Sequence, residues 1–186
     1  MKKLKSLCLI LCMCTTAFAG SNGLSRSQAA KILNKEFAQN GRVFSIPLGR
    51  QIIFGSSNEW NFNAIKALKE AGVINFRYIE KVKHTRGNHV IVIQGLTEEG
   101  MKYFVPSESD GEIAVKLADR TVVRITGILS DAHSAHVEYE WKYTNITPFG
   151  RILTQHSRGY VSIKITEEVK KREVEFSRYD DGWRTR

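Results

Sequence analysis

The sequence predicts an α+β fold in which an α/β half packs with a C-terminal antiparallel β-meander. Two segments of the first half, 27–39 and 57–72, place apolar residues at helical spacing. The second half contains several runs in which apolar and polar residues alternate, as in half-buried strands. The polar, turn-rich stretch PSESDG lies between the two halves. We therefore expect one module at 20–105, a linker at 106–111 and a sheet domain at 112–186.

The first 19 residues have the three parts of a secretory signal peptide. Met1–Lys5 is basic, Ser6–Thr16 is an apolar core and Ala17–Ala19 is an A-x-A cleavage site. The apolar core is shorter than the roughly 20 residues that span a bilayer. We therefore predict export to the periplasm or beyond, with Gly20 or Ser21 as the first mature residue and no transmembrane segment after cleavage.

All three cysteines, Cys8, Cys12 and Cys14, lie in this leader. The mature chain is therefore expected to have no disulfide, no cysteine nucleophile and no thiolate metal site. Lipid attachment at Cys12 or Cys14 is the alternative. The residues before them, Leu11 and Met13, are larger than the small residue that normally precedes a lipidated cysteine. The pattern favours a soluble mature protein over a lipoprotein.

The chain is basic, with a formal net charge of +9 over 186 residues. Loss of the leader would leave about 167 residues and a charge of about +6, enough chain for one sizeable domain or two small ones. A positive protein outside the cytoplasm can meet lipopolysaccharide phosphates, anionic lipids, acidic polymers or an acidic protein. A moderate charge can also serve only to keep a protein soluble.

The first half is predicted to begin with an amphipathic helix at 27–39, capped by Ser25 and ended by Asn40 and Gly41. Its helical face is marked by Ala29, Ala30, Leu33, Phe37 and Ala38. The elements expected after it are, in order, a short strand with a loop at 43–54, a helix at 57–72, strands at 73–83 and 89–94 joined by a polar turn, and a short helical segment at 96–104.

Part of this half resembles a winged-helix module. Residues 64–74 read AIKALKEAGVI, a basic hairpin follows them, and residues 96–100 read LTEEG. In that family a helix that ends at a glycine leads into a two-stranded wing, and an L-T-x-x-G turn follows. The resemblance covers about forty residues of the chain. It implies that the hairpin is a contact surface, because many winged-helix domains place the wing on DNA phosphates.

The predicted wing carries basic side chains that suit contact with anions. These residues are Lys81, Lys83, His84, Arg86 and His89. We expect them to form the site that binds an anionic envelope component or another exported protein. DNA is a poor fit, because export removes the protein from the chromosome and the helix that would read bases carries no arginine. A solvated turn is the simplest structural explanation of the same charges.

The second half is predicted to contain four or five strands in meander order. The clearest is 136–144, whose alternating apolar residues are Val137, Tyr139, Trp141 and Tyr143. We expect this strand to be central and to end before Pro148, because proline cannot donate to a central ladder. The other strands are expected at 113–117, 121–129, 160–165 and 169–179, with Asp180-Asp181-Gly182 turning the chain into a final hairpin that contains Trp183.

This pattern is similar to the curved sheets of cystatin-like and NTF2-like domains, and the ending FSRYDDGWR resembles that of small exported bacterial proteins. Such folds include enzymes, ligand carriers and interaction modules. The resemblance implies a concave face that can hold a pocket, for which the candidate residues are Tyr139, Trp141, Phe176 and Trp183. A core position at the end of the sheet is the simpler explanation of Trp183.

The best candidates for a metal or acid–base site are His133, His136 and Glu138, of which the last two share one face of a strand. The outward face of a strand is the ordinary place for such residues, and a zinc site generally needs three or four supported ligands. Asp180 and Asp181 are adjacent in a turn, where their carboxylates point apart. The sequence contains no G-x-S-x-G, no P-loop, no H-E-x-x-H and no dinucleotide-binding fingerprint. We predict no metal, no cofactor and no catalytic residue.

The sequence therefore favours an exported, non-catalytic protein that binds a macromolecular or anionic envelope partner. Two alternatives stay open. One is a small-molecule carrier or enzyme that uses the concave face of the sheet. The other is an inhibitor or immunity-type partner of another exported protein.

Mass spectrometry of the protein expressed in an exporting bacterium tests the leader. We expect a chain that begins at Gly20 or Ser21 and contains no thiol, because cleavage removes every cysteine. Replacing Ala19 with arginine should block cleavage and leave the full-length chain. A product that begins at Cys12 or Cys14 and carries a lipid would contradict this prediction.

Overall fold

A computed structural model describes residues 23–39, 41–54, 59–81, 89–106, 110–156 and 163–186. The fold is α+β, with two antiparallel sheets in these ranges. The helices are α1 (Arg26–Gln39), α2 (Glu59–Glu70), α3 (Glu98–Met101) and α4 (Pro148–His156). The strands are β1 (Arg42–Pro47), β2 (Gln51–Phe54), β3 (Ile74–Lys81), β4 (His89–Leu96), β5 (Phe104–Val105), β6 (Glu112–Ser130), β7 (Ser134–Thr144), β8 (Lys170–Tyr179) and β9 (Gly182–Thr185).

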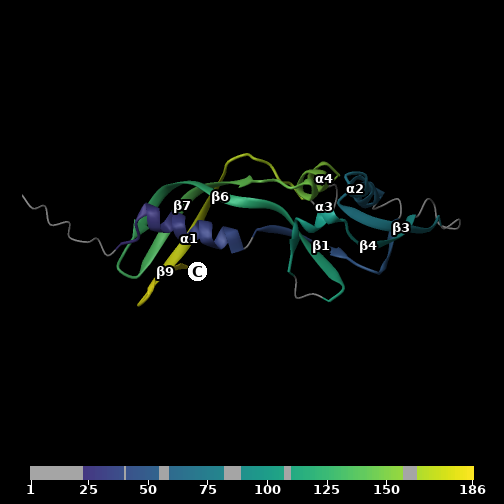
Figure 1. The fold of residues 1–186 in the computed structure, drawn as a ribbon. Coiled ribbons are helices and arrows are strands. Elements are labelled where there is room, and N and C mark those ends of the chain that lie inside the picture. The colour runs from purple at the N-terminus through teal and green to yellow at the C-terminus, as the bar shows by residue number, and fades with distance from the viewer. Residues whose placement is uncertain (1–22, 40, 55–58, 82–88, 107–109, 157–162) are drawn as a thin grey trace, which may run out of the picture.

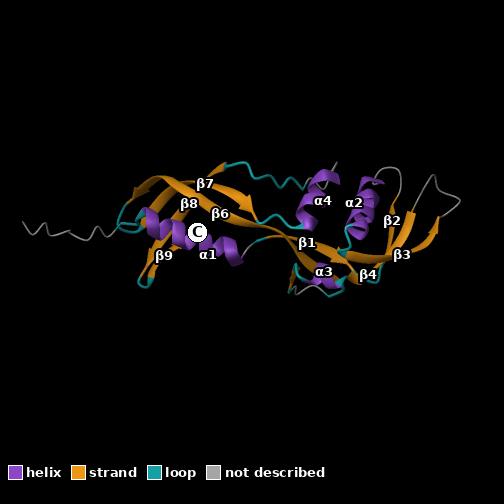
Figure 2. Ribbon diagram, turned by 45° about the horizontal axis from the view of Figure 1, so that its top comes forward, coloured by secondary structure: helices purple, strands orange, loops and turns teal. Residues whose placement is uncertain are grey.

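The long strand β6 joins the two ends of an elongated molecule (Figure 1). The larger sheet has the order β1-β6-β7-β8-β9, with β5 also paired to β6, and the smaller sheet has the order β2-β4-β3. The register between β6 and β7 shifts between Val122 and Arg124 and again between Ile125 and Gly127. Bulges of this kind increase twist and bend the strand. The larger sheet accordingly curves around α1, as Figure 2 shows.

Helix α1 covers the concave face of this sheet and buries Ala29, Leu33 and Phe37 against it. Two of its side chains reach backbone groups beside the bulges. The amide oxygen of Asn34 accepts a hydrogen bond from the Val122 N–H at 2.9 Å. Nη1 of Arg26 donates to the Ile125 carbonyl at 2.8 Å. These polar contacts fix the position of the helix, because they satisfy backbone groups at places where the ladder is irregular.

Strand β7 is the centre of the larger sheet, as its alternating pattern predicts. It lies between β6 and β8. The four alternating apolar residues, Val137, Tyr139, Trp141 and Tyr143, are all buried. The predicted first helix and the C-terminal hairpin of β8 and β9 are likewise confirmed.

Three predicted elements differ from the structure. Strands expected at 113–117 and 121–129 are one strand, β6, because the polar residues between them still pair with β7. Pro148 was expected in a simple break after a strand, but it is the first residue of α4. A proline fits there because the first residue of a helix does not need to donate a backbone hydrogen bond. Residues 163–169 form no strand, although one was expected at 160–165, and residues 160–162 of that prediction lie outside the described ranges.

The strand pairing also crosses the predicted boundary at 106–111. Strand β1 pairs with the first part of β6, and α1 packs on the same sheet. Strand β6 is longer than β7, so the first part of β6 has an edge that β7 does not cover, and β1 pairs with this edge. The predicted leader, 1–19, and residues 107–109 of the predicted linker lie outside the described residues. Among the residues that are described, none of the helices is both long and apolar enough to cross a bilayer.

The corner between β7 and α4 is fastened to β6. The Thr147 hydroxyl donates to the Lys116 carbonyl at 2.7 Å and accepts a hydrogen bond from the Gly150 N–H at 3.2 Å, which caps the helix. The Thr147 N–H donates to the Leu117 carbonyl at 2.9 Å. Helix α4 then packs against α2, and Figure 1 shows the two helices side by side. The corner therefore holds the two sheets together.

Replacing Gly150 with alanine should destabilise the protein by about 1–3 kcal/mol, the usual cost of overpacking. A Cβ at this position would lie 2.3 Å from the Leu117 carbonyl oxygen, so α4 would have to move away from β6. Urea unfolding measures the change. The matched control is Gln155→Ala, an exposed position in the same helix. Equal stability of the two variants would contradict this account of the corner.

Candidate functional site

A cavity of about 470 Å³ lies on the concave face of the larger sheet, next to the end of α1. Its lining combines aromatic and basic side chains. The aromatic residues are Phe37, Tyr139, Trp141 and Tyr143. The basic residues are Arg42, Arg120, Lys170, Lys171 and Arg172.

The strand register explains why these residues meet. Tyr143 lies opposite Arg120 of β6, while Trp141 and Tyr139 lie opposite Lys170 and Arg172 of β8. Residues that face each other across an antiparallel pair share one face of the sheet. Basic side chains therefore flank the aromatic strand on both sides.

Two further basic residues border the cavity. Arg42 enters from the start of β1. Lys171 lies opposite Glu140 in the register and so alternates to the outer face. The inward-facing set is therefore Arg120, Lys170 and Arg172, with Arg42 at the edge.

The cations nearest the aromatic rings lie over their faces. The Arg120 Cζ atom is 5.5 Å from the centre of the Trp141 ring and 6.0 Å from that of Tyr143. The Lys170 Nζ atom is 4.8 Å from the centre of the Tyr143 ring and 5.3 Å from that of Trp141. These are cation–π distances. The rings thus hold two positive charges in place at the cavity.

The described side chains that line the cavity include five basic residues and no acidic one. In the described part of the chain, Arg42, Arg120, Lys170 and Arg172 form no ion pair with a carboxylate. Burial raises the pKa of the Tyr139 hydroxyl above its ordinary 10.0, while the charges of Arg172 and Arg120 act in the opposite direction. Glu36 is close enough to Tyr139 to raise the same pKa, so the excess positive charge of the cavity is only partly offset.

Two buried donors at the cavity lack acceptors. Within the described residues, no hydrogen-bond partner reaches Nε1 of Trp141 or Nε of Arg120, and both atoms are inaccessible to solvent. Trp141 itself is only 6% exposed. Buried donors are nearly always paired, and leaving one unpaired costs about 1–3 kcal/mol. These two donors thus lack hydrogen-bond acceptors, and the described residues that line the cavity include no acid.

The structure places the predicted pocket residues in two groups. Tyr139 and Trp141 line the cavity. Phe176 is fully buried in the core, and Trp183 is partly buried against it, so neither is among the lining residues. The sequence did not reveal the contribution of Phe37, Arg120 and the cations of β8. The available signal was the alternation in Lys170-Lys171-Arg172, which puts two cations on one face once the register is known.

The predicted wing is described only at its ends. Lys83, His84 and Arg86 lie outside the described residues, as does the side chain of Lys81. His89 begins β4 and stacks on Phe62, with ring centres 4.0 Å apart. It also hydrogen-bonds the Tyr78 hydroxyl. His89 is therefore part of an aromatic cluster on the smaller sheet.

A second cavity, of about 660 Å³, lies beside this aromatic cluster. Its two lysines have polar partners. Lys69 donates to the Phe76 carbonyl at 3.1 Å. Lys66 lies 3.7 Å from the carboxylate of Glu70. The contrast makes the cavity on the larger sheet the better anion site.

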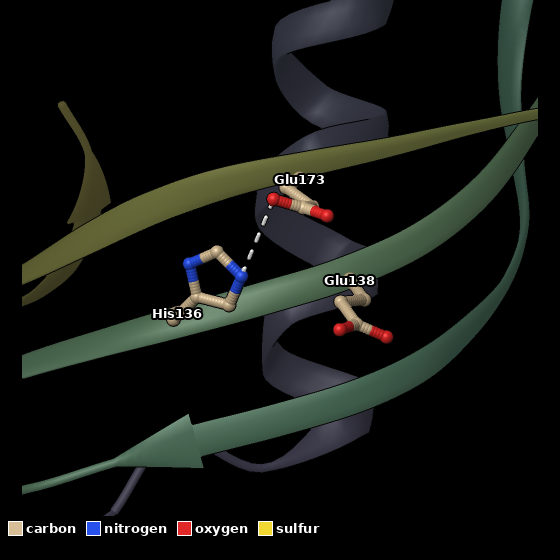
Figure 3. A group of neighbouring side chains, drawn as sticks. All are labelled: His136, Glu138 and Glu173. Carbon is tan, nitrogen blue, oxygen red and sulfur yellow. Dashed lines mark ion pairs between the residues drawn. The ribbon is translucent and has the colours of Figure 1, made fainter.

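The outer face of the larger sheet carries the predicted histidine cluster (Figure 3). His136, Glu138 and Glu173 each place one ligand atom within 4.8 Å of the others, a spacing that can hold a metal ion. Nδ1 of His136 also lies 2.6 Å from a carboxylate oxygen of Glu175, and Nε2 lies 3.6 Å from Glu173. These ion pairs engage His136, while Glu138 has no ion pair among the described residues. The group does not include His133, whose backbone N–H donates to Asp131 in the preceding turn.

The hydrogen bond to Glu175 raises the pKa of His136 above its ordinary 6.5, against the opposing effect of desolvation. Some charges of the outer face are thus paired with one another, and Arg124 likewise pairs with Glu140 at 2.7 Å. In the concave cavity, Arg42, Arg120, Lys170 and Arg172 form no such ion pair with a described carboxylate.

Comparison with known proteins adds no relative. No protein-family model matches the chain, and searches of curated proteins and of solved structures found no match.

An NMR titration of His136 should give a pKa above 6.5, and Glu175→Gln should lower it. Because the folded pKa exceeds the unfolded one, the interaction stabilises the fold below pH 6.5 and is lost as the pH rises through the folded pKa. Glu138→Gln is the matched control, since Glu138 adds only a minor charge effect. A larger change in this control than in Glu175→Gln would contradict the assignment.

Proposed function

We propose that the protein is a non-catalytic binding protein whose concave cavity takes an anionic ligand or an anionic group of a larger envelope partner. The observation that carries this proposal is the set of unpaired cations, Arg42, Arg120, Lys170 and Arg172, around an aromatic cavity. We further propose that the protein works in the periplasm or outside the cell, as the leader predicts.

The electrostatics support this proposal. Like charges held close together destabilise a fold, and the stabilisation by cation–π contacts is about 0.5–2 kcal/mol each. An anion would relieve the repulsion and would supply acceptors to Trp141 and Arg120. A cavity of about 470 Å³ falls in the range of small-ligand sites.

The chemistry of the lining favours binding over catalysis. Catalysis of acyl or phosphoryl transfer generally uses a nucleophile or a general base within hydrogen-bond reach of the substrate. The described lining consists of aromatic rings and of arginine and lysine side chains, which can orient and neutralise an anion.

We also propose that α2, β3, β4 and α3 form a winged-helix-like module. In support, α2 ends just before Gly72, whose φ of 70° suits a helix terminus. The Thr97 hydroxyl caps α3 by accepting from the Gly100 N–H. A Cβ at Gly100 would lie 1.9 Å from the Val73 carbonyl oxygen, so this turn requires glycine. The wing residues, including His89, would then form a second contact surface.

A binding assay with charged and uncharged polymers tests the proposed function. We expect the purified protein to bind dextran sulfate and not dextran in isothermal titration calorimetry. The double variant Arg120→Gln/Lys170→Gln should bind roughly tenfold to a hundredfold more weakly, because a hydrogen bond to a charged group contributes about 1.5–3 kcal/mol. As the salt concentration rises, the affinity of the unaltered protein should also fall more steeply than that of the double variant.

The matched control is Lys142→Gln, which removes one positive charge from the opposite face of the same strand. Its affinity should stay close to that of the unaltered protein. The control removes one positive charge and the double variant removes two. A control loss of half or more of the double variant's loss in binding free energy would show that net charge alone drives binding, and the proposal would then be wrong.

A further inference from the structure

We propose that the ligand of the concave cavity is a phosphate monoester, held through its phosphoryl group by Arg120 and Lys170. This inference rests on the proposed anion-binding function and names the chemical class of the ligand. It is carried by the occupied ring faces, the unpaired donors, the number of cations and the size of the cavity.

Cations lie over the faces of Trp141 and Tyr143, where a flat ligand would otherwise stack. Arg120 lies over Phe37, Trp141 and Tyr143, at 5.9, 5.5 and 6.0 Å from the ring centres. Lys170 lies over the last two of these rings. Trp141 and Tyr143 also meet edge to face, with ring centres 5.0 Å apart. The rings thus position cations, and an incoming ligand meets positive charge before it meets an aromatic surface. This favours a compact oxyanion over a nucleobase or a bare sugar ring.

The unpaired donors call for a ligand with several acceptor oxygens. Trp141, which is 6% exposed, and Arg120 each hold one buried N–H without an acceptor among the described residues. The Lys170 ammonium and the rest of the Arg120 guanidinium add further donors. A carboxylate has two oxygens, whereas the terminal phosphoryl group of a monoester has three. An arginine fork matches the phosphoryl geometry in a bidentate manner.

A small side-chain movement gives the ligand access to these donors. Lys170 has a flexible four-carbon side chain and lies 5.3 Å from the centre of the Trp141 ring. It can swing from the rings toward a bound phosphoryl oxygen without losing a charge partner, because it has no ion pair with a described carboxylate. In the proposed complex Lys170 and Arg120 contact the oxyanion, and the Trp141 N–H is expected to become a further donor to it.

The charge and size of the site complete the assignment. A phosphate monoester carries about −1.5 to −2 at neutral pH, against −1 for a carboxylate. The greater charge matches a site with Arg42 and Arg172 at its edge as well as the two central cations. A volume of about 470 Å³ exceeds the needs of a single phosphate. The remainder of the cavity accommodates the organic part of the ester.

Three ligands that share one sugar ring test the inference: glucose 6-phosphate, glucuronate and glucose. We expect calorimetry with the purified protein to give at least about tenfold tighter binding of the phosphate ester than of the carboxylate, and no binding of glucose. Arg120→Lys keeps the charge but removes the fork. It should therefore reduce the preference for the phosphate ester, while Lys142→Gln leaves it unchanged. Circular dichroism verifies that each variant is folded.

Vesicles distinguish a free ester from a lipid headgroup. Phosphatidic acid presents a phosphate monoester, whereas phosphatidylglycerol presents only a diester. Tighter binding of glucose 6-phosphate than of glucuronate, or of phosphatidic acid vesicles than of phosphatidylglycerol vesicles, supports the inference and identifies the source. Equal binding of ester and carboxylate together with equal binding of the two lipids overturns it.

The outcomes separate this inference from the proposed function. If dextran sulfate binds in a manner that depends on Arg120 and Lys170 but the phosphate ester shows no preference, the anion site stands and the ligand class is wrong. If neither dextran sulfate nor any phosphate ester binds, both proposals are wrong.

Discussion

The pairing of β6 with its neighbours is the constraint on which the rest of the molecule depends. Its first part pairs with β1 and β5, and the remainder pairs with β7. Bulges after Val122 and Ile125 bend the sheet, and α1 uses Asn34 and Arg26 to bind backbone groups at those places. The Thr147 corner fixes α4 to the same strand. Curvature, helix position and the joining of the two sheets therefore all follow from one strand.

The same curvature creates the site. Aromatic residues of β7 face inward, where α1 covers part of them with Phe37, and cations of β6 and β8 lie at the part that α1 leaves open. A core usually excludes charge, but here the ring faces of Trp141 and Tyr143 hold Arg120 and Lys170 in place. On the outer face, in contrast, Arg124 and His136 form ion pairs with carboxylates of the same sheet. Two faces of one sheet thus have opposite electrostatic characters.

The sequence predicts those elements whose signal is local. The alternation in β7 identifies both the central strand and its buried aromatics, and helical spacing identifies α1. The sequence does not predict helix α4, because Thr147-Pro148 has the pattern of a break after a strand, although a capping threonine followed by proline also begins helices. The cations of the cavity depend on register, which brings Arg120 beside Tyr143 from 23 positions along the chain. No local pattern contains that pairing, so the predicted site centred on the wing.

The indole N–H of Trp141 offers the most direct test that an anion occupies the cavity. Its ¹H–¹⁵N resonance, assigned by its loss in Trp141→Phe, is followed while glucose 6-phosphate is added to the purified protein. Because this N–H is buried and unpaired, a new acceptor should shift its resonance strongly, while that of Trp183 stays in place. An unchanged Trp141 resonance at a ligand concentration that saturates binding would contradict the account.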